Sequence, residues 1–181
     1  IHPANTSVNP DLIYENLYKW IENKQIIAIG EIGLENLTDS EIAIFKKQLD
    51  IGEETKTKVI VHTPRKNKKE VLKVIQDIVP QHIDPKLVVI DHINQNVAED
   101  VIDKDYTLGL TVQPQKMDKE EAIAILDEYG FDKFLLNSDI SNKPSDPLSV
   151  PKTVRELEKL GYKKTEIEKV AFKNAEKFFK I

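Results

Sequence analysis

The sequence predicts an α/β fold in which short strands alternate with helices and pair in parallel. Five short runs are almost continuously apolar and rich in β-branched residues, which is typical of strands buried on both faces of a parallel sheet. Helical patterns separate these runs, and 40% of the 181 residues are hydrophobic, as in an ordinary globular protein. The alternation therefore predicts consecutive βα units.

The predicted elements follow one another without an internal repeat or a long linker. Strands are expected at residues 25–32, 58–63, 86–92, 106–113 and 133–139. Helices are expected at residues 11–23, 39–55, 68–79, 95–102, 119–129, 151–160 and 166–179. We therefore treat residues 1–181 as one domain and the Pro-, Ser- and Asn-containing loop 141–149 as a candidate active-site loop.

Capping residues support several of these helix starts. Asn9 stands before a proline at the first turn of the first helix, where a proline is well tolerated. Thr38 with Glu41, and Thr165 with Glu168, have the spacing of a capping box. Helices are therefore expected to begin directly after these Asn and Thr residues.

Composition and charge exclude several classes of protein. The longest apolar stretches are far shorter than the ~20 residues of a membrane-spanning helix, so we expect no membrane span. With 26 basic and 31 acidic residues, the net charge of -5 argues against strong non-specific binding of nucleic acid. The absence of Cys excludes thiolate nucleophiles and Cys-ligated zinc and fits a cytoplasmic location.

Two architectures accommodate alternating βα units, an open doubly wound sheet and a (βα)8 barrel. A dinucleotide-binding open sheet should carry a G-x-G-x-x-G turn after an early strand, and the close pair Gly30 and Gly33 lacks the third glycine. Polar residues instead stand at the carboxyl end of almost every predicted strand, which is where barrel enzymes assemble their sites. We therefore expect a TIM barrel.

Four of these strand ends carry ionisable residues that suit a metal site. Glu31, His62, His92 and Asp139 each follow apolar neighbours, and the intervals between them match one, one and two βα units. We expect the four side chains to point toward one axis at the same mouth of the barrel. Such a mixed nitrogen and oxygen ligand set suits Zn²⁺, Mn²⁺ or Mg²⁺ and can hold a hydroxide nucleophile.

Each of these residues also has a purely structural interpretation. Glu31 can bond a neighbouring backbone amide, and His62 and His92 can be satisfied imidazoles of the core. Asp139 can cap the loop that follows it. Four such residues at four strand ends, in the right order, favour a shared site over four separate structural roles.

Over nearly its whole length the sequence resembles the TatD-type metal-dependent hydrolases of the amidohydrolase-like barrels. The resemblance rests on His2-Pro3, the G-E-I-G-L box at residues 30–34, His62, His92, Ser138-Asp139 and the N-A-E-K-F stretch at residues 174–178. It implies that Glu31 bridges or binds metal and that both histidines are metal ligands. It also implies that Asp139 binds metal and accepts the proton of the attacking water.

The chain departs from the family pattern at several positions. Glu35 stands where the family usually has Asp, and Arg65 lies three residues beyond His62 rather than two. The last strand ends in N-S-D-I-S at residues 137–141 instead of a T-D-S-P type box. These differences suggest a divergent branch whose substrate need not be DNA. Arg65 and His2 remain our candidates for binding the substrate.

The family's first strand carries an H-x-H pair, and this sequence contains none. If His2-Pro3 matches the end of the third strand, roughly sixty residues would precede residue 1 in a complete barrel of ~250 residues. We therefore expect an N-terminally incomplete barrel with about five full strands in this chain. An earlier segment of the gene product, a companion chain or a partner molecule is expected to supply the rest.

The leading hypothesis is a metal-dependent hydrolase of phosphoesters or phosphodiesters, DNase-like, with one or two divalent ions. The substrate is then a small molecule or a nucleic acid that carries a phosphate ester, and the acidic balance slightly favours a small one. Hydrolysis of an amide or a lactone would fit the wider superfamily. A barrel scaffold without catalysis is the alternative from another class, and an open-sheet nucleotide-binding protein is a third.

Overall fold

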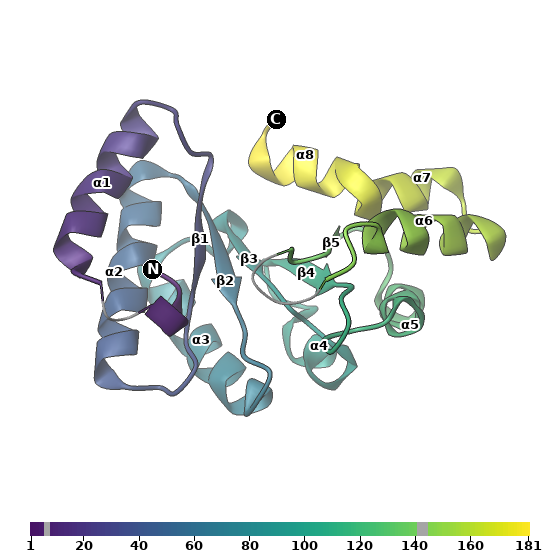
Figure 1. The fold of residues 1–181 in the computed structure, drawn as a ribbon, viewed down its shortest axis with the longest axis horizontal. Helices are drawn as coiled ribbons and strands as arrows, with labels where there is room; N and C mark the ends of the chain where they lie inside the picture. The colour runs from purple at the N-terminus through teal and green to yellow at the C-terminus, as the bar shows by residue number, and fades with distance from the viewer. Residues whose placement is uncertain (6–7, 141–144) are drawn as a thin grey trace. The chain divides into compact units, whose positions relative to one another are not determined.

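The computed structural model describes residues 1–5, 8–140 and 145–181. These residues form two compact units, Ile1–Ile90 and Asp91–Ile181, and each is described by itself. In both units strands alternate with helices along the chain (Figure 1). The single domain expected over residues 1–181 stays a prediction.

The first unit contains three parallel strands. It runs in the order η1 (Pro3–Asn5), α1 (Pro10–Glu22), β1 (Ala28–Gly33), α2 (Asp39–Thr55), β2 (Lys58–His62), α3 (Lys68–His82), η2 (Pro85–Leu87) and β3 (Val88–Ile90). Strand β2 pairs in parallel with β1 on one side and with β3 on the other. The predicted strands and their parallel pairing are therefore confirmed here, with ends shifted by a few residues.

Helices α1 and α2 begin where their capping residues predict. The side chain of Asn9 accepts from the backbone N–H of Asp11, and that of Thr38 accepts from the N–H of Glu41 at 3.2 Å. Each bond satisfies a donor that the first helical turn leaves unpaired. The two helices lie side by side, and α2 packs against β1 (Figure 1).

A dry apolar layer holds α2 and α3 to the strands of the first unit. Its members have fully or almost fully buried side chains and come from both helices and from β1, β2 and β3: Ile32, Phe45, Leu49, Val59, Val61, Leu72, Ile75 and Ile90. Burial of such side chains stabilises the folded state by about 25 cal/mol for each Å² of apolar surface removed from water. The strand ends that carry polar residues are therefore set on a rigid support.

The second unit contains two parallel strands. It runs in the order α4 (Gln95–Val101), β4 (Thr107–Thr111), α5 (Lys119–Tyr129), β5 (Phe134–Asn137), α6 (Ser149–Lys159), α7 (Lys164–Glu168), η3 (Lys169–Lys173) and α8 (Asn174–Phe179). Strands β4 and β5 pair in parallel from Leu108 opposite Phe134 to Thr111 opposite Asn137. Side chains at the centre of this unit, such as Leu110, Ile125 and Leu157, are fully buried.

The last predicted helix differs most from the structure. Residues 166–179 were expected to form one helix capped by Thr165, but the helix begins at Lys164 and a π-helical segment, η3, separates α7 from α8. Thr165 thus lies inside α7, and the structure gives this helix no side-chain cap. Both η3 and α8 contact β5, and Asn174 donates to the carbonyls of Phe131 and Phe134 at 2.8 Å.

Among the described residues, no helix combines the length and the apolar character that crossing a membrane requires.

Candidate metal centre

Glu31 lies in an irregular part of β1, directly before a close approach to β2. The pairing of β1 with β2 shifts register between Ile29 and Ile32, and such irregularities often re-aim a side chain next to a site. Gly33 then pairs with His62 at a backbone φ of +154°. A Cβ at Gly33 would lie 2.6 Å from the carbonyl oxygen of His62, so only glycine allows the two strand ends to meet.

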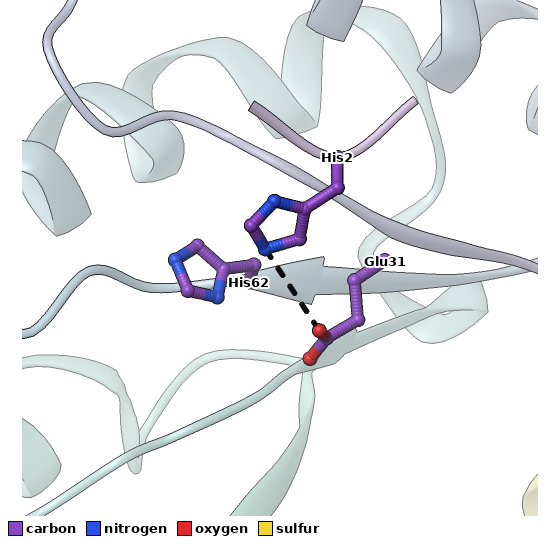
Figure 2. Close-up of side chains that lie close together, drawn as sticks. All are labelled: His2, Glu31 and His62. Atoms are coloured by element: carbon purple, nitrogen blue, oxygen red, sulfur yellow. Dashed lines mark ion pairs between the residues drawn. The ribbon is translucent and has the colours of Figure 1, made fainter. Parts of the chain in front are cut away.

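His2, Glu31 and His62 form a cluster at these strand ends (Figure 2). One nitrogen or oxygen ligand atom from each residue lies within 4.8 Å of those of the other two. His2 Nε2 is 4.0 Å from Glu31 Oε2, and the two imidazole rings are 4.6 Å apart between centroids. His62 is buried, whereas His2 and Glu31 are partly exposed, so the cluster can be reached from solvent.

Two further carboxylates surround this cluster. Glu35 places Oε1 2.7 Å from His62 Nε2. Glu41 is buried and accepts from the backbone N–H of Asn36 at 2.9 Å and of Glu35 at 3.3 Å. Glu41 therefore holds the turn after β1 and with it the backbone of Glu35. The sequence marked Glu35 only as a departure and Glu41 only as part of a capping box.

His92 lies in the second unit, where hydrogen bonds orient its imidazole ring. Its Nδ1 lies 2.7 Å from Thr111 Oγ1, and that hydroxyl lies 3.3 Å from Asp91 Oδ1. A hydroxyl that donates to the Asp91 carboxylate can accept the Nδ1 proton of His92, which makes Nε2 the nitrogen whose lone pair faces a cation. Asp91 thus orients His92 through Thr111.

Asp91 is itself enclosed. Its Oδ1 also accepts from the backbone N–H of His92 at 2.7 Å and from Asn137 Nδ2 at 2.9 Å. Gly109 makes room for it, because a Cβ at that position would lie 2.0 Å from Asp91 Oδ1. These contacts fix the buried carboxylate beside the strand end of β4.

Asp139, the predicted proton acceptor, contacts two side chains from the loop between β4 and α5. Lys116 Nζ is 2.5 Å from Asp139 Oδ2 and 3.0 Å from His92 Nε2. Gln113 Nε2 donates to the backbone carbonyl of Asp139 at 2.8 Å. We call His92, Lys116 and Asp139 the ammonium cluster. Lys116 was not predicted from the sequence, where only its place after a strand end could have indicated it.

Both ligand candidates of the ammonium cluster have a left-handed backbone. The φ angles are +62° at His92 and +42° at Asp139. For a residue other than glycine this conformation costs about 1–3 kcal/mol and is found preferentially at functional sites. It agrees with a functional role for these two positions.

The structure thus divides the predicted ligands between the two units. It brings Glu31 and His62 together with His2 in the first unit, and His92 and Asp139 together around Lys116 in the second. The convergence of all four on one mouth stays a prediction. Arg65, our other substrate-binding candidate, is exposed in the turn before α3. Residues 141–144 of the predicted active-site loop lie outside the described residues.

The donor atoms of both clusters suit a divalent cation. Imidazole nitrogen and carboxylate oxygen are ligands that Zn²⁺ and Mn²⁺ accept, and the first cluster presents all three ligand atoms within 4.8 Å. In the ammonium cluster, an imidazole nitrogen and a carboxylate oxygen already bind one positive charge, the ammonium group of Lys116. The residues therefore fit a metal.

Comparison with known proteins identifies relatives over the whole chain. The sequence model of the family described as TatD related DNase matches residues 1–180. A protein of Methanocaldococcus jannaschii described as an uncharacterized metal-dependent hydrolase is 36% identical over 186 aligned positions, which cover 100% of this chain and 72% of that protein.

Solved structures of similar fold also cover the whole chain. A TatD-like protein from Archaeoglobus fulgidus superposes with a TM-score of 0.78 at 34% identity, covering 100% of this chain and 70% of that one. A TatD homologue from Escherichia coli superposes with a TM-score of 0.74 at 19% identity, covering 100% and 75%. The predicted (βα)8-barrel class is thereby confirmed, and the described residues of this chain contribute five strands to it.

Proposed function

This chain belongs to the TatD-related DNase family of metal-dependent hydrolases, and we propose that it cleaves phosphoester or phosphodiester bonds with a water molecule activated by one or two divalent cations. The observation that carries the proposal is that Glu31 and His62 bring their ligand atoms together at the strand ends, within 4.8 Å of each other and of His2, the proposed phosphate contact. A mixed imidazole and carboxylate set at the end of parallel strands is the arrangement in which barrel hydrolases bind metal.

Four residues are proposed as the metal ligands. Glu31 and His62 contribute from the first unit, and His92 and Asp139 from the second. When bound, a divalent cation such as Zn²⁺, Mn²⁺ or Mg²⁺ polarises the scissile group and lowers the pKa of water. Glu35 orients His62 through its 2.7 Å contact with Nε2, and Thr111 orients His92 through Nδ1.

Asp139 is proposed to take the proton of the attacking water. Its carboxylate is partly exposed, and its backbone carbonyl accepts from Gln113 Nε2 at 2.8 Å, so the position of Asp139 is defined before substrate arrives. A positioned general base contributes about 10²–10⁴ in rate. Asp139 is therefore the residue whose loss should reduce turnover most without removing substrate contacts.

Arg65 and His2 are proposed to contact the phosphate of the substrate. Arg65 is followed by Lys66, Lys68 and Lys69, so a local basic segment stands at the start of α3 in a chain of net charge -5. A local patch of this kind binds a single phosphate group, whereas a nucleic-acid backbone is bound by a broader basic surface. A small phosphate ester or the end of a nucleic acid is therefore the proposed substrate.

Hydrolysis of bis(4-nitrophenyl) phosphate and of a short oligonucleotide tests the proposal. The purified protein is treated with EDTA, dialysed and assayed before and after addition of Mn²⁺, Zn²⁺ or Mg²⁺. We expect activity only with metal, and a fall of kcat of at least ~100-fold in Asp139→Asn. Asp105→Asn, an exposed acid of the loop before β4, is the control and should leave kcat unchanged.

Three other results would contradict the proposal in different ways. Metal-dependent cleavage of a lactone or an amide without cleavage of phosphate esters would retain the hydrolase and change the substrate class. Cleavage that survives EDTA would show that metal is not required. A protein that shows no activity and binds no metal would indicate a barrel that serves as a scaffold.

A further inference from the structure

Lys116 is the one residue of the ammonium cluster that the proposed chemistry does not use. Its ammonium lies 2.5 Å from Asp139 Oδ2 and 3.0 Å from His92 Nε2, and only 11% of its side chain is exposed. These two acceptor atoms belong to two of the four proposed metal ligands. A lysine therefore places a positive charge against the atoms that a divalent cation would bind.

The backbone of Lys116 is held in place by a closed turn. The N–H of Met117 donates to the carbonyl of Gln113 and the N–H of Gln113 donates to the carbonyl of Met117, at 3.3 and 3.1 Å. The N–H of Lys116 also donates to the carbonyl of Gln113 at 3.0 Å. The side chain of Gln113 in turn donates to the backbone carbonyl of Asp139 at 2.8 Å, which ties this turn to the residue that carries the carboxylate. The contact of Lys116 is thus a built feature of the loop.

A metal ion and this ammonium cannot both bind His92 Nε2, because that nitrogen has a single lone pair, and at Asp139 Oδ2 the two cations repel each other. Zn²⁺ binds histidine nitrogen and carboxylate oxygen at about 2.0–2.2 Å, well inside the 2.5 and 3.0 Å distances of Lys116 Nζ. Three positive charges would then share one carboxylate and one imidazole at close range in a half-buried place. Their repulsion opposes simultaneous binding.

We propose that Lys116 competes with the divalent cation for His92 and Asp139, and that metal binding at this pair requires the lysine to leave. Without metal, the ammonium neutralises Asp139 and keeps the two ligands at a fixed separation. It is thus a positioning residue that lowers the affinity of the site. This inference rests on the proposed function in so far as it assigns His92 and Asp139 as metal ligands.

The structure also provides a place for the displaced side chain. Lys116 lines a cavity of about 510 Å³ together with other residues of the β4–α5 loop and the start of α6. Asp118 and Asp146 line the same cavity, where Asp146 pairs with Lys152 at 2.6 Å and Asp118 caps α5. A four-carbon side chain can turn from Asp139 into this cavity with its backbone unchanged.

Metal titration of Lys116→Met tests the inference, with Mn²⁺ and isothermal titration calorimetry of EDTA-treated, dialysed protein. We expect Mn²⁺ to bind Lys116→Met at least tenfold more tightly than wild type. Lys119→Met is the matched control: it removes a lysine from the same cavity, but one that pairs with Glu156 at 2.8 Å, and should bind Mn²⁺ like wild type. Lys116→Gln should behave like Lys116→Met and serves if the methionine variant does not fold.

Thermal unfolding supplies a second readout. Without metal, Lys116→Met should melt at a lower temperature than wild type, because Asp139 loses its cation, and saturating Mn²⁺ should raise its Tm by more than it raises that of wild type. Equal Mn²⁺ affinity in wild type and Lys116→Met would overturn the inference and leave the metal function standing. Weaker binding in the variant would also overturn it, since Lys116 would then assist the metal. Absence of Mn²⁺ binding in every protein would overturn both this inference and the proposed function.

Discussion

At the scale of single residues, each of the two clusters contains an imidazole that neighbouring side chains orient by hydrogen bonds. Glu35 holds His62, and Thr111 holds His92 while Asp91 holds Thr111. Outer partners of this kind fix the tautomer and direction of a metal-binding imidazole. The orientation of the proposed ligands therefore depends on these neighbouring residues.

Thr111→Val removes one such partner while keeping the shape of the side chain. His92 Nδ1 loses its hydroxyl partner, so we expect the affinity for Mn²⁺ to fall about 10- to 100-fold. Calorimetric titration measures this, and Thr107→Val at the other end of β4 is the control. Unchanged affinity in Thr111→Val would mean that Thr111 does not orient the ligand.

At this scale the sequence predicted the ligand candidates but not Lys116. Glu31, His62, His92 and Asp139 stand at strand ends, and strand ends are visible as the points where apolar runs stop. Lys116 stands within a loop, and its contact with Asp139 arises from the turn that Gln113 and Met117 close. No local pattern in the sequence marks such a turn.

At the scale of elements, the sequence predicted helix bounds well where a side chain caps the first turn of the helix. Helices α2 and α5 have the predicted bounds, and each is capped by a side chain, Thr38 or Asp118. The last helix was not predicted correctly, because its π-helical segment packs against β5 and Asn174 bonds the loop before that strand and the strand itself. Tertiary contacts decide such features, and a single-residue signal cannot show them.

The two threonines that the sequence treats alike should differ in stability effect. Thr38→Ala removes a cap bond and should lower the free energy of unfolding by about 1 kcal/mol. Thr165→Ala changes an exposed residue inside α7 and should leave it within about 0.5 kcal/mol of wild type. Urea denaturation followed by circular dichroism measures both. Equal losses would contradict the assigned start of α7.

At the scale of the whole molecule, buried and bonded tyrosines predict how stability depends on alkaline pH. Burial raises the pKa of Tyr106 to about 12, and hydrogen bonds to Glu54 and Asp127 raise the pKa values of Tyr18 and Tyr162 to about 12. A raised pKa means that the folded state holds the proton more tightly than the unfolded chain. The resulting stability is complete below pH ~10 and is lost as pH rises toward 12.

We therefore expect Tm to fall steeply between pH 10 and 12, and to fall less steeply in Tyr106→Phe, which has no phenol to ionise at that position. Thermal unfolding across this range, with tyrosinate absorbance recorded in parallel, measures the effect. A variant with the same slope as wild type would show that Tyr106 does not contribute to it.

The central claim is that Glu31, His62, His92 and Asp139 bind divalent metal, and metal content tests it most directly. Purified protein is incubated with Mn²⁺ or Zn²⁺, freed of unbound ion by gel filtration and analysed by inductively coupled plasma mass spectrometry. We expect wild type to retain one or two ions per chain, and Glu31→Gln and Asp139→Asn to retain fewer while keeping the far-ultraviolet spectrum of wild type. A wild type without bound metal, or variants that retain as much as wild type, would contradict the claim.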